Sequence, residues 1–244
     1  MFINDLLPPP SQIRWISRKK LIAYFDFAKE DENIKKINII PSAKLKQFEE
    51  INSLAEINSK TIVISYESFS IFIALPFPYN LDLTFYKIED IKSILTNNIS
   101  VGIAFLELGS YVLGLVKFNK ILFSKRGSRY VKGRHKAGGQ SQRRFERNRE
   151  KWIDELYKKI SLDINEHLYP LKQNMDHFVL FGDTNILSDF LSESKIGKQF
   201  QNKLITKKTS LKNFNAKTLI TASTTIWSSR IYIDDKNAIV EKIY

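Results

Sequence analysis

Two adjacent glycines and a glutamine, Gly138, Gly139 and Gln140, are the residues of this chain whose types and spacing best suit chemistry on a bound substrate. A glycine has no Cβ, so its backbone can adopt positive φ and come close to another molecule. The Gln140 side chain is an amide without a basic lone pair, so it is not a general base near neutral pH. Its backbone N–H can donate to a developing oxyanion, an effect worth about 3–4 kcal/mol per donor in other enzymes.

The triplet lies in the most cationic stretch of the chain. From Lys117 to Lys151 there are 13 lysines and arginines against two glutamates, a balance of +11, whereas the whole chain carries +12. Charge so localised is typical of a site for a polyanion, and RNA is the natural candidate. The alternative is a linker with solvated charges, but the mutual repulsion of so many cations destabilises a compact chain. A linker has no need of so many cations, so the sequence favours a binding site.

The expected RNA contacts flank the triplet on both sides, because arginine forks to phosphate and stacks on bases. The residues are Arg129, Lys132, Arg134, His135, Lys136, Ser141, Arg143, Arg144, Arg147 and Arg149. We expect some of them to be ordinary solvated charges on a helix surface. Ser141 is expected to cap the helix that follows, which leaves the positive end of the helix directed at phosphate.

The elements that must position the triplet are a β-meander and a long helix. Strands are predicted at 101–108, 111–118 and 121–125, and the third strand leads into the glycine-rich loop. A helix is predicted from Ser141 to about Leu168, where Pro170 ends it. Such a helix is on the order of 40 Å long. Its apolar stripe consists of Phe145, Trp152, Leu156, Ile160 and Ile164.

Further helices and strands are predicted on both sides of this segment. The ranges are a helix at 17–29, a helix at 41–59, a hairpin of strands 61–66 and 70–75, a helix at 87–96, a strand at 178–181, a helix at 187–196, a strand at 203–211, and a terminal hairpin of strands 225–233 and 238–244. Because helices and strands interleave, the predicted fold class is α/β, or α+β with a mixed sheet.

Composition excludes several kinds of site. The chain has no cysteine, which rules out disulfides, thiolate-bound zinc and a cysteine nucleophile. The three histidines, His135, His167 and His177, do not fall at metal-ligand spacing, so we expect no metal and no cofactor. No secretory leader and no apolar run of about 18 residues is seen, which predicts a soluble, cytoplasmic protein without membrane contact. Glu107, Asp183, Asp234 and Asp235 are too scattered to suggest a two-metal nuclease.

The stretch SRYVKGRHKAGGQSQRRFER, placed after a strand and before a long helix, resembles the catalytic middle domain of class I translation termination factors of eukaryotes and archaea. It is more similar still to the release-factor-like peptidyl-tRNA hydrolases of ribosome-associated quality control. The strong resemblance covers residues 127–151, and a weaker one, through element order, covers 7–210. No segment before the loop resembles a decoding domain, so stop-codon reading is not expected.

The resemblance implies a release-factor middle-domain fold with a mobile Gly-Gly-Gln loop leading into the long helix. It implies one catalytic domain over 1–244, with an N-terminal lobe at 1–80, a core at 98–211 and a C-terminal hairpin at 212–244. In such a protein Gly138, Gly139 and Gln140 would be the catalytic residues, with the Gln140 side chain orienting the attacking water or limiting its access. RNA, including the terminal ribose hydroxyl of the tRNA, would complete the site.

The activity implied is ribosome-dependent hydrolysis of the peptidyl-tRNA ester, which releases stalled nascent chains during ribosome rescue. The expected partners are peptidyl-tRNA and the rRNA of the large subunit at the peptidyl transferase centre. The protein is expected to be a monomer, cytoplasmic and ribosome-associated. Two alternatives stay open: cleavage of the tRNA near its 3′ CCA end on the same complex, and a non-catalytic factor whose loop only contacts ribosomal RNA.

Overall fold

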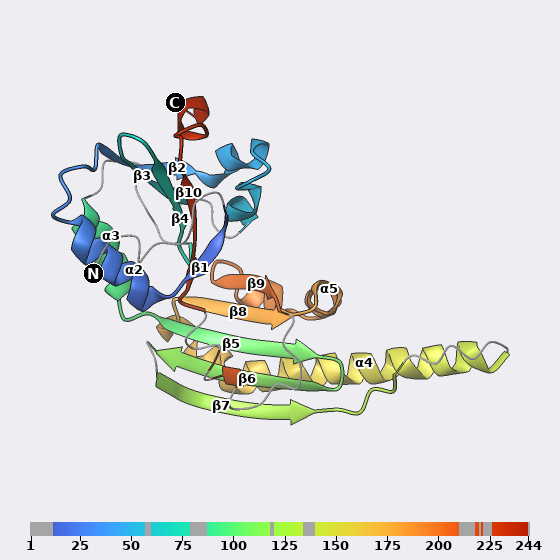
Figure 1. The fold of residues 1–244 in the computed structure, drawn as a ribbon. Helices are drawn as coiled ribbons and strands as arrows, with labels where there is room; N and C mark the ends of the chain where they lie inside the picture. The colour runs from blue at the N-terminus through green and yellow to red at the C-terminus, as the bar shows by residue number, and fades with distance from the viewer. Residues whose placement is uncertain are drawn as a thin grey trace. The chain divides into compact units, whose positions relative to one another are not determined.

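The computed structural model describes residues 12–56, 60–78, 87–117, 120–133, 140–209, 218–219, 221 and 226–243. The chain forms two compact units, one made of 1–97 with 224–244 and the other of 98–223. Each unit holds a five-stranded sheet (Figure 1). The mixed α/β fold class is therefore confirmed. The domain boundaries at 1–80, 98–211 and 212–244 stay a prediction.

The first unit is built on an antiparallel sheet in the order β1-β10-β4-β3-β2. Helices cover one face of this sheet and two 3-10 helices cover the other, so both faces bury apolar side chains. The strands are β1 (Arg14–Ile16), β2 (Lys36–Pro41), β3 (Lys60–Ser65), β4 (Ser70–Ala74) and β10 (Ser229–Asp234). The helices are α2 (Arg18–Ala28), η1 (Ser42–Gln47), η2 (Asn52–Glu56), α3 (Ile88–Thr96) and α8 (Val240–Ile243).

The single helix predicted at 41–59 is wrong, because η1 and η2 occupy the described part of this range. The backbone of Phe48 is extended and ends the first of them. The apolar residues Leu45, Phe48, Ile51 and Leu54 follow one another at intervals of three. An interval of three matches the three residues per turn of a 3-10 helix. The spacing thus fits the observed structure better than it fits an α-helix.

The predicted terminal hairpin is also wrong. Strand β10 pairs with β1 on one side and with β4 on the other, so both of its edges are occupied. One carboxylate oxygen of Asp234 accepts hydrogen bonds from the backbone N–H groups of Ile239 (2.7 Å) and Val240 (3.4 Å). This turn directs the chain into the short helix α8 and away from a returning strand.

The second unit contains a mixed sheet in the order β7-β6-β5-β8-β9. The pairs β5–β6 and β6–β7 are antiparallel, whereas β5–β8 and β8–β9 are parallel. The strands are β5 (Ser100–Glu107), β6 (Ser110–Lys117), β7 (Lys120–Ser128), β8 (His177–Gly182) and β9 (Leu204–Lys208). The helices are α4 (Gln140–His167), η3 (Tyr169–Asn174), α5 (Thr184–Glu193) and α6 (Ile196–Gln199). The predicted meander and long helix are confirmed.

Helix α4 packs on this sheet through only its C-terminal half. Leu156, Ile160 and Ile164 are fully buried in a cluster with residues of β5, β6 and β8, as the apolar stripe predicts. By contrast, Phe145 is 49% exposed, and Trp152 is half-buried. The N-terminal part of α4 extends well past the ends of the strands (Figure 1). The long helix therefore carries its first turns away from the core.

Gly127, near the end of β7, lies against the buried ring of Tyr111, and a Cβ built on it would come within 2.1 Å of that ring. Gly127→Ala should therefore destabilise the second unit by about 1–3 kcal/mol, the usual cost of overpacking. Urea titration measures this difference. Gly133→Ala is the matched control, because nothing lies within 4 Å of its Cβ position. Equal stability of the two variants would contradict this packing.

Candidate nucleic-acid interface

Most of the predicted catalytic loop lies outside the described residues. Gly138 and Gly139, together with Arg134, His135 and Lys136, fall in 134–139. Gln140 is the first residue of α4, and Ser141 is the second; their backbones are described, their side chains are not. The prediction that Ser141 caps this helix is wrong, because Ser141 already lies within it. The structure therefore locates the two ends of the loop, at Gly133 and at Gln140. It does so through contacts that tie the incoming chain to α4.

After β7 the chain runs along α4 toward the N-terminus of that helix. The Ser128 carbonyl accepts a hydrogen bond from Lys159 (3.0 Å), and Arg129 donates two hydrogen bonds to one oxygen of Glu155 (3.2 and 2.6 Å). The ring of Tyr130 meets Trp152 edge-on, with 5.6 Å between centroids. We call the segments 128–133 and 140–159 together the arm.

The last contact before the loop is between Lys132 and Phe145. The Lys132 ammonium lies 5.0 Å from the centre of the Phe145 ring, a cation–π contact. As the incoming chain advances from Ser128 to Lys132, its partner on α4 moves back from Lys159 to Phe145. The two segments are thus joined over several turns of helix. Gly133 and Gln140, which flank residues 134–139, therefore lie at the ends of two segments that are joined to each other.

We call the contacts between residues 128–132 and α4 the brace. Two of the predicted RNA contacts, Arg129 and Lys132, take part in it. The hydrogen bonds from Arg129 hold the pKa of the Glu155 carboxyl below its ordinary value. Because Glu155 and Arg129 are both partly solvent-accessible, their pairing contributes geometry more than free energy. A role for Arg129 and Lys132 in binding RNA stays a prediction. In the structure both side chains join the incoming segment to α4.

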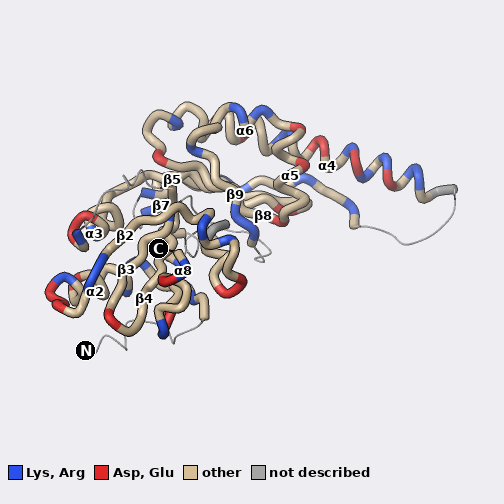
Figure 2. Tube along the Cα trace, turned by 90° about the horizontal axis from the view of Figure 1, so that it is seen from above, with Lys and Arg blue, Asp and Glu red and all other residues tan. Residues whose placement is uncertain are grey.

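Three further predicted contacts, Arg143, Arg144 and Arg147, are exposed on the first turns of α4. Among the described residues, none of the three forms an ion pair with a carboxylate. The nearby Glu146 accepts a hydrogen bond from Gln142 instead (3.0 Å). Figure 2 shows the basic residues spaced along this projecting part of α4. Their charges repel one another, and a bound polyanion would relieve that repulsion.

Arg149, the fourth arginine on this helix, is half-buried. Its Nε is buried and has no hydrogen-bond partner among the described residues. It therefore differs from the three exposed arginines nearer the loop.

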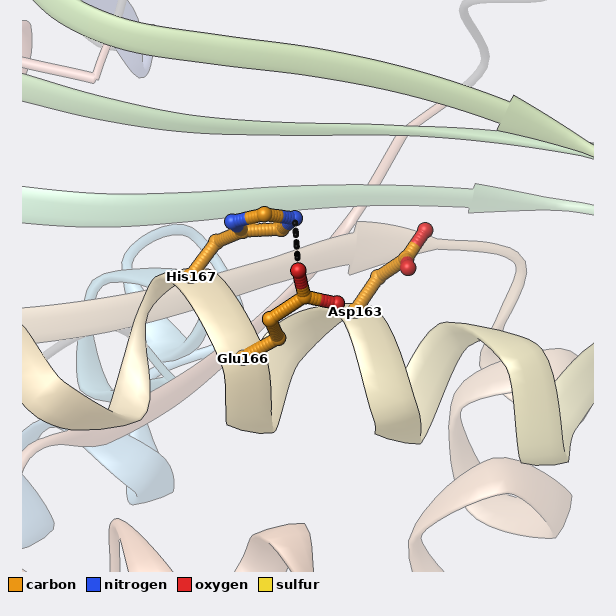
Figure 3. Close-up of side chains that lie close together, drawn as sticks. All are labelled: Asp163, Glu166 and His167. Carbon is orange, nitrogen blue, oxygen red and sulfur yellow. Dashed lines mark ion pairs between the residues drawn. The ribbon is translucent and has the colours of Figure 1, made fainter.

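A polar cluster ties the other end of α4 to the sheet. Figure 3 shows Asp163, Glu166 and His167 on the last turns of the helix, with an ion-pair distance of 3.6 Å between Glu166 and His167. One ligand atom from each residue lies within 4.8 Å of the others, a spacing that a metal ion could use. However, the Lys125 ammonium from β7 already donates to Asp163 (3.0 Å) and lies 2.7 Å from His167 Nε2. The lysine thus supplies the positive charge that a metal would bring.

Asp163 also accepts a hydrogen bond from the Tyr111 hydroxyl of β6. Burial alone would raise the pKa of Asp163, but the hydrogen bonds from Tyr111 and Lys125 outweigh burial and lower it. Burial and this bonded carboxylate raise the pKa of Tyr111. The cluster therefore joins β6, β7 and α4 at the base of the arm. Asp163 and His167 are four residues apart and share one face of the helix. The sequence analysis compared the histidines only with one another, so it did not find this pair.

Residues 100–232 match the sequence profile of the Actinobacteria/chloroflexi VLRF1 release factor family. This match covers more than half of the chain. The chain belongs to the VLRF1 release-factor family. The resemblance to release factors that the sequence predicts is thereby confirmed. The matched range starts at β5, includes the whole arm, and ends in β10.

Curated relatives of this VLRF1-family chain are archaeal proteins named peptide chain release factor subunit 1. The protein from Archaeoglobus fulgidus is 30% identical over 129 residues, which is 53% of this chain and 31% of that protein. The protein from Methanopyrus kandleri is 33% identical over 130 residues, again 53% and 31%. The chain thus spans about a third of the length of the curated relatives that it matches.

Solved structures show a weaker likeness. An archaeal translation termination factor, aRF1, has 14% identity and a TM-score of 0.39, with 87% of this chain and 73% of that chain covered. Pelota from Archaeoglobus fulgidus has 10% identity and a TM-score of 0.32. The family assignment rests on the sequence profile. Within the described segments, no helix combines the length and apolar composition that a membrane crossing demands.

The brace should determine how stably the N-terminal half of α4 is folded. Tyr130→Ala removes the edge-on contact with Trp152, and such aromatic pairs are worth about 0.5–1.5 kcal/mol. We therefore expect amide hydrogen exchange at residues 142–152 to accelerate by about three- to tenfold through local opening, while 156–167 stays unchanged. Asn148→Ala, an exposed change on the same helix, should leave exchange as it is. Uniform acceleration along α4 would contradict a local brace.

The Lys125–Asp163 contact predicts a pH effect. Because the folded-state pKa of Asp163 lies below its unfolded value, its contribution is present above about pH 4 and is lost as the pH falls through the folded value. Lys125→Met should raise that pKa, so acid unfolding begins at a higher pH, and should cost about 1–3 kcal/mol at neutral pH. Acid titrations followed by circular dichroism measure both. A large rise in melting temperature of the wild type with Zn²⁺ would instead indicate a metal site.

Proposed function

We propose that the chain is a ribosome-dependent peptidyl-tRNA hydrolase that releases stalled nascent chains from the large ribosomal subunit. The observation that supports this proposal is the arm. Its described ends, Gly133 and Gln140, flank the segment that carries Gly138 and Gly139. Its exposed Arg143, Arg144 and Arg147 form no ion pair with a carboxylate among the described residues. A site of this kind suits a pocket made of RNA. The curated relatives, named peptide chain release factors, support the same chemistry.

The reaction would be hydrolysis of the ester between the peptide and the tRNA. Water attacks the ester carbonyl, a tetrahedral oxyanion forms, and the bond to the ribose 3′-oxygen breaks. The leaving oxygen takes a proton, and the products are a free peptide carboxyl group and a tRNA with its 3′-hydroxyl. The chemistry needs hydrogen-bond donors at the oxyanion or at the leaving oxygen more than it needs a strong base.

Gln140 can supply such a donor from its backbone. It is the first residue of α4, and the first N–H groups of a helix have no intrahelical acceptor. The helix dipole adds partial positive charge at the same end. The adjacent glycines would let the backbone approach the substrate closely. In this proposal Gly138, Gly139 and Gln140 position the ester and water, and ribosomal RNA with the tRNA ribose completes the site.

The arginines would serve binding. Arg143, Arg144 and Arg147 on the helix, with Arg134, His135 and Lys136 in the loop, are proposed to contact the RNA backbone of the peptidyl transferase centre and peptidyl-tRNA. If about six phosphates are neutralised, the affinity for the large subunit should fall with salt with a log–log slope of about −4 to −5. The protein would act as a monomer in the cytoplasm, on ribosomes whose nascent chain is obstructed.

Release of peptide from purified large subunits loaded with peptidyl-tRNA tests the proposal. Gly139→Ala should lower the rate of release by about 100-fold, because a Cβ disturbs the close approach and the donor geometry. Gln140→Ala keeps the backbone donor but loses the side chain that orients water, so we expect about a tenfold loss or more. Lys236→Ala, which removes one exposed charge from the first unit, should release peptide like the wild type.

The products distinguish the three activities. An intact CCA end on the released tRNA means ester hydrolysis, whereas a shortened 3′ end means nucleolytic cleavage. Salt-sensitive binding to the subunit with no turnover at any enzyme excess means a non-catalytic factor. Unchanged release by Gly139→Ala and Gln140→Ala together would refute the proposed role of the triplet.

A further inference from the structure

Tyr130, in the brace, is the most exposed of the large hydrophobic side chains that the structure describes. Its side chain is 70% exposed, whereas Phe145 on α4 is 49% exposed and Trp152 is half-buried. The Tyr130 ring meets Trp152 edge-on, with 5.6 Å between centroids and 70° between the ring planes. At this exposure the described residues leave at least one face of the Tyr130 ring uncovered.

The chain on both sides of Tyr130 is held against α4. Before it, the Arg129 guanidinium donates to Glu155 (2.6 Å), and after it, the Lys132 ammonium lies 5.0 Å from the centre of the Phe145 ring. The Tyr130 hydroxyl forms no hydrogen bond with a described residue. The ring is thus exposed and yet fixed in place. A side chain that is fixed before binding loses little conformational entropy when a partner covers it.

The two exposed rings of the arm differ in what lies against them. The Lys132 ammonium is placed over Phe145, whereas the guanidinium next to Tyr130, that of Arg129, is directed at Glu155. Among the described residues, no cation lies over the Tyr130 ring. Tyr130 is therefore the ring of the arm that can take another flat group against its face.

A row of cations leads from this ring toward the loop. Arg144, Asn148, Lys151 and Glu155 follow one another at intervals of four, three and four, so they share one face of α4. The hydrogen bond from Arg129 and, more weakly, the charge of Lys151 lower the pKa of the Glu155 carboxyl. Arg144 and Lys151 are exposed, and neither forms an ion pair with a described carboxylate. The row is thus positive from Lys151 to Arg144.

An open aromatic ring beside a row of cations matches the chemistry of single-stranded nucleic acid. The cations suit the phosphates, and the ring suits the face of a base. In a duplex that face is covered by the neighbouring bases, so the matching group is an unpaired base. A carboxylate-rich peptide would use the cations alone and leave the ring uncovered. A basic peptide would be repelled by the row.

We propose that Tyr130 stacks on an unpaired base of single-stranded RNA, while Arg144 and Lys151 contact the phosphates on either side of that base. The inference rests on the proposed function in one respect, that the polyanion at the arm is RNA. It adds a base-binding position to a surface otherwise assigned to phosphate contacts. Stacking does not depend on the sequence of the RNA, because every base has a flat π-face.

The test compares two ligands of the full chain by fluorescence anisotropy. One is an oligouridylate of about eight nucleotides, and the other is an abasic chain of the same length and charge. The wild type should bind the oligouridylate about fivefold or more tightly than the abasic chain. Tyr130→Leu keeps an apolar contact with Trp152 but cannot stack, so it should bind the two chains equally. Tyr130→Phe keeps the ring and should retain the wild-type preference.

The cations are tested by the double change Arg144→Gln and Lys151→Gln. It should weaken binding of both chains alike and reduce the log–log salt slope by about 1.4 in magnitude, while the preference for bases persists. Leu162→Ala is the matched control, since Leu162 is 68% exposed on the same helix and lies outside the arm. This variant should bind both chains like the wild type.

Equal binding of both chains by the wild type overturns the proposal, and so does a preference that Tyr130→Leu retains. A loosened brace would weaken both chains alike and leave the preference, so it is distinguished from lost stacking. If an oligoglutamate of equal charge binds as tightly as the oligouridylate, the surface is a general polyanion site and stacking is refuted. Gly139→Ala should keep the base preference. Failure of the release assay and failure of stacking are therefore seen separately.

Discussion

The contact between the chain leaving β7 and the N-terminal half of α4 is the interaction on which the rest of the candidate site depends. An isolated helix of a dozen residues is marginal in water, and the first turns of α4 lie beyond the sheet that would otherwise stabilise them. They also carry Arg143, Arg144 and Arg147, whose charges repel one another. The contacts from Ser128 to Lys132 compensate for the missing support of the sheet. They let a charged helix persist outside the core and hold a loop at its end.

The base of the arm is held by chemistry of a different kind. The cluster of Lys125, Asp163 and Tyr111 is partly buried and joins two strands to α4 through hydrogen bonds. The outer contacts, Arg129 with Glu155 and Tyr130 with Trp152, are more exposed and individually weaker. The arm is therefore firm at its base and more adaptable toward its end. This gradient suits a loop that must fit a pocket made by another molecule.

Charge is distributed unevenly along α4. Arg143, Arg144 and Arg147 near its N-terminus form no ion pair with a described carboxylate, whereas Asp154 and Lys158 farther along the helix act in opposite directions on Glu193 of α5. The excess of positive charge is therefore greatest at the end of the helix next to the Gly-Gly-Gln segment.

The amino-acid sequence by itself determined the meander, the long helix and the buried stripe of Leu156, Ile160 and Ile164. It also determined the cationic segment around the Gly-Gly-Gln triplet, because periodicity, glycine pairs and charge density are local properties of a chain. Only the tertiary structure decided the pairing of β10 between β1 and β4, which replaced the expected terminal hairpin. It alone showed that Trp152 meets Tyr130 outside the core, and that Arg129 is matched to Glu155. These partners are 22 and 26 residues apart in the chain. No local pattern encodes such distances; packing of α4 on the sheet brings the side chains together.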